Sequence, residues 1–340
     1  MLPLVFEPYV RPQIWGGRAL GEQFGKRLSD PEQMYGESWE VSGHPHHPSR
    51  VAEGEFAGRM LPELFAEFQN SILGAAGRYE QFPLLIKLLD CQRTLSVQVH
   101  PDDFAARELL GEPNGKTEAW VVLATGDNAV VYAGFKPGVD RNELVSRLES
   151  GTVEDCLHSF IPKVGDCLFM PAGLVHAVGG GVVMAECQQA SDATFRLYDW
   201  NRIDPATGAP RKLHIEEALQ SIHFDLAPGR PTTPTPRTSL PPGVRAEHLV
   251  ACPYFRLDRF EFSVGGLVPT FLPLPGGECT IWLVLDGACV LEGADYRRLF
   301  VKGETVLLPA DCEPLAWRIP ADVEHTPTTS AQLLRVHVPR

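Results

Sequence analysis

The sequence predicts an all-β protein with a small helical insertion. Short apolar runs recur along the chain between turns rich in glycine and proline, which is typical of barrels and sandwiches of β-strands. One of these runs, residues 94–100, alternates strictly between polar and apolar side chains, as a strand with two different faces does. Apolar residues at helical spacing are confined to short segments.

The first part of the chain is expected to form strands around one helical segment. Residues 1–50 are rich in proline, glycine and aromatic residues, which favours short strands and loops. Apolar residues then recur at helical spacing, and Pro62 suits a first helical turn, so a small helical insertion is expected within residues 55–80. Further strands are expected at residues 83–90, 94–100, 118–124 and 129–133.

The middle of the chain is expected to continue with strands and two short helices. One helix should begin near Asp140, whose carboxylate can cap it while Glu143 completes a capping box. The other is expected at residues 215–222. Strands are expected at residues 163–170, 174–178, 182–188 and 194–200, and later at residues 255–262, 280–285, 288–292, 305–308 and 333–338.

Two regions of the chain resemble each other. Residues 119–126 resemble residues 281–287, and farther along residues 165–172 resemble residues 303–310. Two matches in the same order predict an internal duplication. The proline-rich residues 228–242 predict an extended, semi-rigid linker, so the expected domains are residues 1–227 and residues 243–340.

Composition limits the classes of partner and compartment. The formal net charge of −13 argues against a broad surface for nucleic acid or for an anionic membrane. The eight cysteines are scattered singly, without a C-x-x-C pair, and mostly among apolar residues, as buried thiols are. No signal peptide is recognisable at the N-terminus, so a reducing cytoplasm is the expected compartment.

The polar face of residues 94–100 has two interpretations. It carries Thr94, Ser96, Gln98 and His100, and it could be the wet face of a surface strand. The alternative is a barrel strand whose polar face lines the interior and offers Gln98 and His100 to a metal ion.

A downstream motif favours the metal site. The spacing Gly165-x5-Pro171-x-Gly173-x2-His176 matches the second signature of the cupin superfamily, in which the histidine is a metal ligand. The first signature is altered, because Gln98-x-His100 replaces His-x-His and the carboxylate, Glu118, comes later. Nitrogen and oxygen ligands suit Zn²⁺, while Fe²⁺, Mn²⁺ and Co²⁺ remain open. The expected architecture is a bicupin of two jelly-roll barrels.

Several motifs together resemble the type I mannose-6-phosphate isomerases, in their shorter bacterial branch. They span residues 95–102, 114–120, 171–176 and 188–200, and the shorter stretches at residues 15–16, 36–40 and 213–215 fit as well. The resemblance implies a zinc enzyme that interconverts mannose 6-phosphate and fructose 6-phosphate through a cis-enediol. It implies one zinc ion per chain, with the ligands Gln98, His100, Glu118 and His176. One departure is Val178, where the longer enzymes of the family carry a tyrosine.

The resemblance also implies roles for other polar residues. Lys116, Glu186 and Arg196 would be catalytic, and Ser96 and Lys87 would bind the substrate. Three of them have an alternative. Lys87 could be a strand-edge lysine, Glu186 could cap a strand end or support a metal ligand, and Arg196 could pair with a nearby aspartate. The proton-transfer base stays open among Glu186, a lysine and a histidine.

The second half of the chain lacks counterparts of two expected ligands. The duplication aligns Thr280 with Glu118 and Pro314 with His176, which predicts a metal in the first domain only. Two alternative functions are a non-catalytic sugar-phosphate-binding bicupin and a metal-dependent cupin oxygenase. Gln98 argues against the oxygenase, which normally carries His-x-His at this place. We expect a monomer or a homodimer that acts on a small sugar phosphate.

Overall fold

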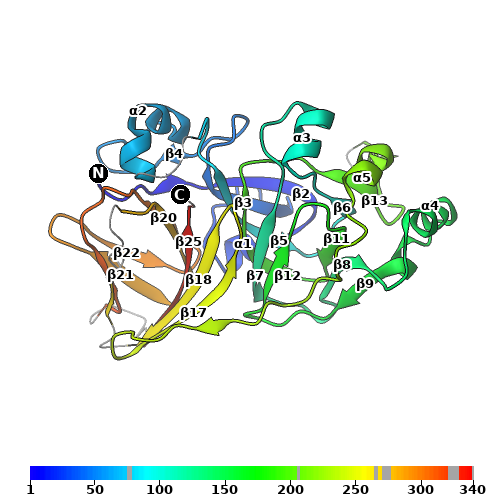
Figure 1. Cartoon of the computed structure of the whole chain (residues 1–340). Helices are drawn as coiled ribbons and strands as arrows, with labels where there is room; N and C mark the ends of the chain where they lie inside the picture. Colours follow the sequence, from blue (N-terminus) through cyan, green and yellow to red (C-terminus); the bar gives the residue numbers. More distant parts are fainter. Residues whose placement is uncertain (75–78, 205–206, 264–266, 270–276, 321–328, 339–340) are drawn as a thin grey trace.

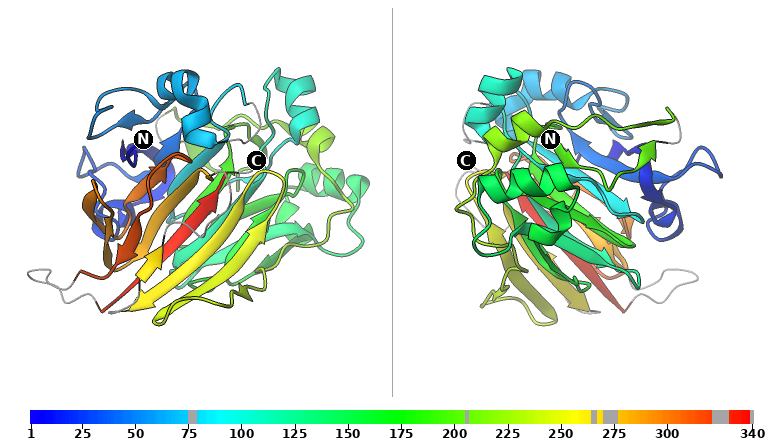
Figure 2. Two further views of the ribbon diagram at one scale, coloured as in Figure 1. Left: turned by 60° about the vertical axis from the view of Figure 1, so that its left-hand side comes forward. Right: turned by 90° about the vertical axis from the view of Figure 1, so that its right-hand side faces the viewer.

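The computed structural model describes the chain except residues 75–78, 205–206, 264–266, 270–276, 321–328 and 339–340. The described residues form mostly strands and few helices, which confirms the all-β prediction (Figure 1). In Figure 1 the strands of the C-terminal half, coloured yellow to red, lie beside those of the N-terminal half, and Figure 2 shows the same arrangement from two other sides.

Two sheets form the N-terminal half, and all their strand pairs are antiparallel. The six-stranded sheet consists, in spatial order, of β10 (Cys167–Met170), β7 (Glu118–Ala124), β12 (Val182–Gln189), β5 (Leu84–Cys91), β3 (Tyr35–Ser42) and β2 (Tyr9–Gly17). The five-stranded sheet consists of β13 (Phe195–Tyr198), β6 (Val97–Val99), β11 (His176–Gly179), β8 (Val130–Phe135) and β9 (Leu157–Phe160).

The C-terminal half is also built of antiparallel sheets. Its six-stranded sheet consists of β16 (Thr235–Pro236), β17 (Val244–Ala251), β18 (Arg256–Ser263), β25 (Ser330–His337), β20 (Thr280–Asp286) and β23 (Thr305–Leu308). A four-stranded sheet consists of β19 (Leu267–Pro269), β24 (Ala316–Arg318), β21 (Ala288–Glu292) and β22 (Arg297–Val301).

The remaining elements are small and lie around these sheets. Two short pairs join β1 (Phe6–Glu7) to β4 (Arg50–Val51) and β14 (Ile203–Asp204) to β15 (Ala209–Pro210). The helices are α1 (Ala19–Glu22), α2 (Leu61–Leu73), α3 (Asp103–Leu110), α4 (Arg141–Ser150) and α5 (Ile215–Ser221), with a 3-10 turn at Val153–Cys156. No helix among the described residues is long and apolar enough to span a bilayer.

Hydrophobic cores hold the sheets in layers. The largest core of the described residues lies between the two six-stranded sheets and includes Ile86 and Leu88 of β5, Leu257 of β18 and Val336 of β25. Separate cores fill the space between the two sheets of each half. A further core joins the outer face of the five-stranded sheet to Leu144 of α4 and other helical residues. That outer packing turns the polar side chains of β6 and β11 inward.

The two six-stranded sheets have the same strand order, which supports the predicted duplication. In the first sheet β12 lies between β7 and β5, and in the second β25 lies between β20 and β18. The registers also agree, since Glu118 opposes Met170 as Thr280 opposes Leu308.

The charges at one shared position of these two ladders are reversed. Lys87 lies opposite Glu186 in the first sheet, and Asp258 lies opposite Arg335 in the second. The two halves therefore share a topology but differ in the polarity of their buried ions.

The structure differs from the sequence-based expectation in two segments near residue 100. The strand expected at residues 94–100 is shorter, because only Val97–Val99 pairs in a sheet and Pro101 follows soon after. Helix α3 was not predicted, because Ala106 is its only buried residue among Asp103–Leu110 and gives no apolar stripe. Local signals do bound it: Asp102 accepts a hydrogen bond from the Ala105 amide, and Gly111 ends it in the left-handed conformation.

Helices α2, α4 and α5 follow the prediction closely, whereas α1 lies within residues 1–50, where the sequence favours strands and loops. Helix α2 spans Leu61–Leu73 within the expected insertion, and the side chain of Asp140 caps α4. The proline-rich segment is extended and bonds to both halves of the chain. The Thr232 amide donates to the Cys167 carbonyl at 2.7 Å, and the Arg237 amide donates to the Ala246 carbonyl at 2.8 Å.

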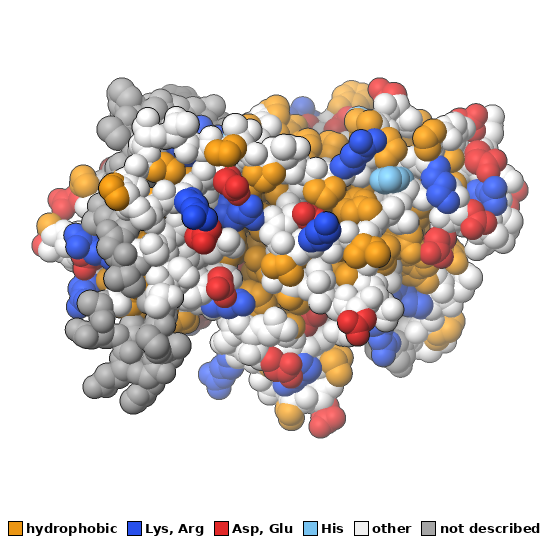
Figure 3. Space-filling view, turned by 90° about the horizontal axis from the view of Figure 1, so that it is seen from below, with side chains coloured by type: hydrophobic (Ala, Val, Ile, Leu, Met, Phe, Trp, Pro, Cys, Tyr) orange, Lys and Arg blue, Asp and Glu red, His pale blue; other side chains and the backbone are white. Residues whose placement is uncertain are grey.

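The surface seen from below is mixed in character. Hydrophobic side chains gather toward the middle of this face, with lysines, arginines and acidic residues spread around them (Figure 3). Apolar surface of this kind is ordinary in folded proteins, so the buried charges are more informative.

The buried carboxylate of Asp258 connects several side chains of the C-terminal half through hydrogen bonds. It accepts hydrogen bonds from Arg335 at 2.6 Å, from His337 at 3.1 Å and from Arg237 at 3.1 Å. Burial alone would raise the pKa of Asp258, but the hydrogen bond from His337 and the charge of Arg335 hold it well below its ordinary value. Removing this carboxylate would leave the buried Arg335 without its partner.

We predict that Asp258→Ala lowers the free energy of unfolding by about 3–5 kcal/mol, the range for breaking a buried ion pair. Urea denaturation followed by circular dichroism measures the change. The matched control is Asp286→Ala, whose exposed carboxylate lies 3.4 Å from Lys302 and should contribute less than about 1 kcal/mol. Equal effects of the two substitutions would contradict the prediction.

Candidate metal centre

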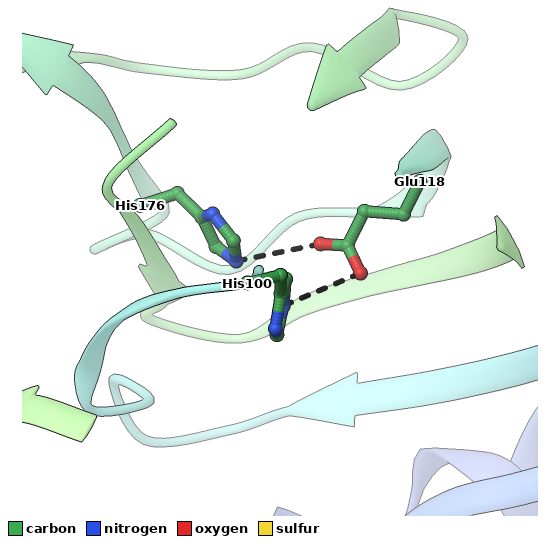
Figure 4. A group of neighbouring side chains, drawn as sticks. All are labelled: His100, Glu118 and His176. Atoms are coloured by element: carbon green, nitrogen blue, oxygen red, sulfur yellow. Dashed lines mark ion pairs between the residues drawn. The ribbon is translucent and has the colours of Figure 1, made fainter. Parts of the chain in front are cut away.

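His100, Glu118 and His176 converge at one point between the two N-terminal sheets (Figure 4). The three side chains are buried, and their ligand atoms all lie within 4.8 Å of one another. His100 Nε2 lies 3.5 Å from Glu118 Oε2, and His176 Nε2 lies 3.4 Å from Glu118 Oε1. In the part of the chain that the structure describes, this is the one group of three such side chains close enough to hold a metal ion.

Each ligand comes from a different part of the two sheets. His100 follows β6, His176 begins β11, and these strands are neighbours in the five-stranded sheet. Glu118 is the first residue of β7 in the six-stranded sheet. Antiparallel pairing of His176 with Gln98 brings the two motifs of the sequence together. Ser96 and His100 are buried and Thr94 and Gln98 are half-buried. The polar side chains of residues 96–100 therefore point toward the cavity and the centre, and this is not a strand with a solvent-exposed face.

Backbone carbonyls orient both imidazoles. The Nδ1 atom of His100 lies 2.7 Å from the Ala193 carbonyl oxygen, and that of His176 lies 2.9 Å from the Leu174 carbonyl oxygen. With Nδ1–H donating to these carbonyls, each Nε2 presents its lone pair to Glu118 and the centre. Burial, reinforced for His100 by the charge of Lys116, lowers the pKa of His100 well below its ordinary value, and burial lowers the pKa of His176 to about 4. Neutral imidazoles and a carboxylate are a donor set that fits a divalent metal ion.

Gln98 lies beside the centre with its amide nitrogen inward. Its Nε2 is 3.4 Å from His176 Nε2, while its Oε1 is 3.5 Å from the Ser96 hydroxyl. A metal ligand must be the oxygen, so the amide has to turn over for Gln98 to join the other three side chains.

Lys116 links the centre to Glu186. Its Nζ lies 2.9 Å from Glu118 Oε2, 3.2 Å from His100 Nε2 and 3.6 Å from Glu186 Oε1. Burial by itself would lower the pKa of Lys116, but the two carboxylates outweigh it and raise that pKa. Burial, with the nearby charge of Glu118, raises the pKa of Glu186 to about 7. The lysine is thus the cation that compensates two buried acids.

A polar cavity of about 240 Å³ opens onto this group. Its walls include every expected site residue except the two histidines, which lie behind them. The cavity is lined mainly by charged and polar side chains, among them Arg11, Gln13, Glu37, Lys87, Ser96, Gln98, Lys116, Glu118, Glu186, Asp192, Thr194, Arg196 and Arg211.

Arg196 reaches the cavity, and among the described residues no carboxylate lies within ion-pair distance of its guanidinium. The nearby Asp199 is engaged by Arg202 and by Arg211, whose Nε lies 2.8 Å from Asp199 Oδ2. Asp192 lies 3.3 Å from Arg11. Arg196 donates instead to the Lys212 carbonyl at 2.8 Å, and within the described residues its buried Nε has no hydrogen-bond partner. Its charge is therefore available to a ligand.

Lys87 also faces the cavity as part of a charged group. It is buried, and its Nζ lies 3.8 Å from both Glu37 and Asp192 and 4.8 Å from the centre of the Trp39 ring. These contacts place Lys87 inside a network, so it is no strand-edge lysine reaching for water. Burial alone would raise the pKa of Asp192, but Lys87 and Lys116 outweigh it and lower that pKa.

Sequence reasoning missed four charged residues of the cavity wall. Arg11 comes from β2, Glu37 from β3, Asp192 from the segment before β13 and Arg211 from the segment after β15, and they meet only in the folded chain. Glu37 and Asp192 do fall within stretches that carry the family resemblance, which was the one available signal.

Known proteins resemble this chain along most of its length. A model of the phosphomannose isomerase type I catalytic domain matches residues 4–119. The mannose-6-phosphate isomerase of Streptococcus mutans is 36% identical over 322 residues, which cover 95% of this chain and 96% of that protein. The chain belongs to the type I mannose-6-phosphate isomerase family.

Further proteins of this family are similar to the chain in sequence or in fold. The mannose-6-phosphate isomerase ManA of Bacillus subtilis is 33% identical over 90% of this chain and 93% of its own length. The crystal structure of the mannose 6-phosphate isomerase from Bacillus subtilis superimposes with a TM-score of 0.87 at 30% identity, covering 99% of this chain and all of that one. A variant of phosphomannose isomerase from Salmonella typhimurium, 17% identical with a TM-score of 0.74, shares the fold.

We predict that metal affinity changes little between about pH 7 and about pH 5.5. Two histidines with ordinary pKa values near 6.5 would together weaken binding about 70-fold over this range, because a proton competes for each imidazole. His100 and His176 stay neutral there, so their protonation should weaken binding less than about twofold. Titration calorimetry of the metal-free protein with Zn²⁺ checks this, and the His176→Ala variant shows that the heat comes from this centre. A loss of about 70-fold would contradict the prediction.

Proposed function

We propose that this chain is a zinc-dependent aldose-ketose isomerase that interconverts mannose 6-phosphate and fructose 6-phosphate through a cis-enediol intermediate. The observation that carries the proposal is the buried His100–Glu118–His176 group beside Lys116, opening onto a cavity of about 240 Å³ lined by charged side chains. Family membership over nearly the whole chain supports the choice of substrates, since the relatives are named for this reaction.

The expected ligand set suits this chemistry. His100, Glu118 and His176 would hold one zinc ion per chain, with Gln98 as a fourth ligand once its amide turns over. When bound, the metal supplies Lewis-acid stabilisation of the negative charge that develops on the enediolate oxygens.

Other residues of the chain would bind the substrate, stabilise its developing charge and transfer the proton. Ser96 and Lys87 bind the substrate, because both are buried and both face the cavity. Arg196 offers an uncompensated guanidinium to the charge that develops on the substrate. Lys116 and Glu186 lie 3.6 Å apart at the cavity wall and are placed to hold and move the proton between the two sugar carbons.

We also propose a bicupin architecture for the chain. Residues 1–227 would be the catalytic jelly-roll barrel and residues 243–340 a second barrel without metal ligands, joined through residues 228–242. The equal strand order of the two six-stranded sheets supports it, as does Thr280 at the position of Glu118. We also propose that the chain is a cytoplasmic enzyme acting on a small sugar phosphate, the substrate class for which its relatives are named.

Chelation should abolish the isomerase activity, and Zn²⁺ should restore it. A coupled reduction assay with each sugar phosphate as substrate measures the rate, and elemental analysis of the same samples gives the metal content. Glu118→Gln keeps the size of the side chain but removes its charge, so it should bring both metal content and rate down by at least about 100-fold. Stoichiometric metal without any turnover would instead indicate a non-catalytic sugar-phosphate-binding protein.

Arg196→Ala should lower kcat/KM by about 100-fold to 1000-fold while metal content stays unchanged, because it removes a charge that acts on the reacting substrate. The matched control is Arg147→Ala on α4, an arginine that pairs with Glu143 at the helix surface and should leave the rate unchanged. The assigned role fails if the two variants behave alike.

A further inference from the structure

The carboxylate of Asp103 joins three segments behind the metal centre. Asp103 begins α3, and its Oδ1 accepts hydrogen bonds from the Gly115 amide at 2.8 Å and from Gln189 Nε2 at 2.9 Å. Its Oδ2 accepts one from the Tyr254 hydroxyl at 2.8 Å. Hydrogen bonds to a charged acceptor are stronger than neutral ones, so this carboxylate is a firm junction.

The junction holds the backbone from which Lys116 and Glu118 extend. The Gly115 amide donates to Asp103, the Lys116 amide donates to the Pro101 carbonyl at 2.9 Å, and the Thr117 amide donates to Gln189 Oε1 at 2.9 Å. Since Gln189 is itself held by Asp103, two of these three amides depend on one carboxylate.

The fit of this segment against residues 101–103 is close. A Cβ added at Gly115 would lie 2.4 Å from the Asp102 carbonyl carbon and 2.6 Å from the Pro101 carbonyl oxygen. A glycine is required by this approach, and it leaves the backbone no side chain with which to anchor itself. The Asp103 carboxylate supplies that anchor.

Tyr254 reaches the junction from the C-terminal half of the chain. It lies in the turn between β17 and β18, which the Cys252 amide closes by donating to the Phe255 carbonyl at 3.0 Å. Its ring packs against the core between the two six-stranded sheets. A cavity of about 630 Å³ borders Asp103, Gln189 and Tyr254, so removing the Tyr254 hydroxyl would disturb no closely packed interior.

We propose that Tyr254 and Asp103 are positioning residues for the metal centre. Through them the C-terminal half fixes residues 115–118, and with them the side chains of Lys116 and Glu118. Neither residue lines the polar cavity, so both act through the backbone they hold. Displacement of a catalytic group by about 1 Å can lower the rate about 100-fold, so even a small displacement of residues 115–118 would lower the reaction rate. The part of this inference that concerns catalysis rests on the proposed isomerase function.

The test compares Tyr254→Phe with the unaltered protein. Loss of the hydroxyl should speed amide hydrogen exchange in peptides covering residues 114–118 about tenfold, raise the dissociation constant for Zn²⁺ several-fold, and lower kcat while KM for the sugar phosphate changes little. Asp103→Asn should act in the same direction and more strongly, because the charge is removed from both amide contacts. The absorption bands of the Co²⁺-substituted protein should shift in both variants, since they report the geometry of the metal ligands.

Two matched controls separate positioning from general loosening. Tyr296→Phe removes another hydroxyl of the C-terminal half, one without a hydrogen-bond partner among the described residues, and should change none of these measurements. Asp102→Asn alters the neighbouring carboxylate but keeps an acceptor for the Ala105 amide, so it too should have little effect.

Unchanged exchange at residues 114–118 together with an unchanged zinc affinity in folded Tyr254→Phe would overturn the inference. Exchange and metal binding need no turnover. A chain without isomerase activity would therefore refute the proposed function, while these two measurements would still decide the positioning role.

Discussion

A buried carboxylate held among two neutral histidines and one lysine is the constraint on which this structure depends. Glu118 is almost wholly removed from water, where an uncompensated charge would be very costly. Lys116 compensates it directly at 2.9 Å, and backbone carbonyls keep His100 and His176 aimed at it. The sheets must therefore bring three distant segments into register, and antiparallel pairing of β11 with β6 does so.

Much of this centre could be predicted from the sequence because its signals are local. The spacing from Gly165 to His176 and the alternation that ends at His100 can be read along single strands, and the structure brings both histidines together with Glu118. The cavity wall could not be predicted in the same way. Arg11 and Asp192 are 181 positions apart and meet through the fold alone. Helix α3 could not be predicted from apolar periodicity, because Ala106 is its only buried residue and it has no amphipathic pattern.

The sequence predicted the fold class from short strands and turns, and the duplication from two repeated stretches. How the two repeats pack against each other could not be predicted, because it depends on contacts between distant segments. The core between the six-stranded sheets contains both Ile86 of β5 and Leu257 of β18, and no local sequence pattern encodes that they share one core. This shared core also explains why a turn of the C-terminal half can reach the segment that carries Lys116. The two halves are therefore best understood as one packed body with a polar centre on one side.

The reversed ions at the shared ladder position bear on how the repeats sort themselves while the chain collapses. If β18 took the place of β5, Asp258 would face Glu186, and if β5 took the place of β18, Lys87 would face Arg335. Either exchange would bury two like charges in contact, which is strongly unfavourable in a low-dielectric interior. Tandem copies of one topology are prone to trade strands during folding. Here the reversed charges of the two ladders favour pairing of each strand within its own repeat and disfavour exchange of strands between the repeats.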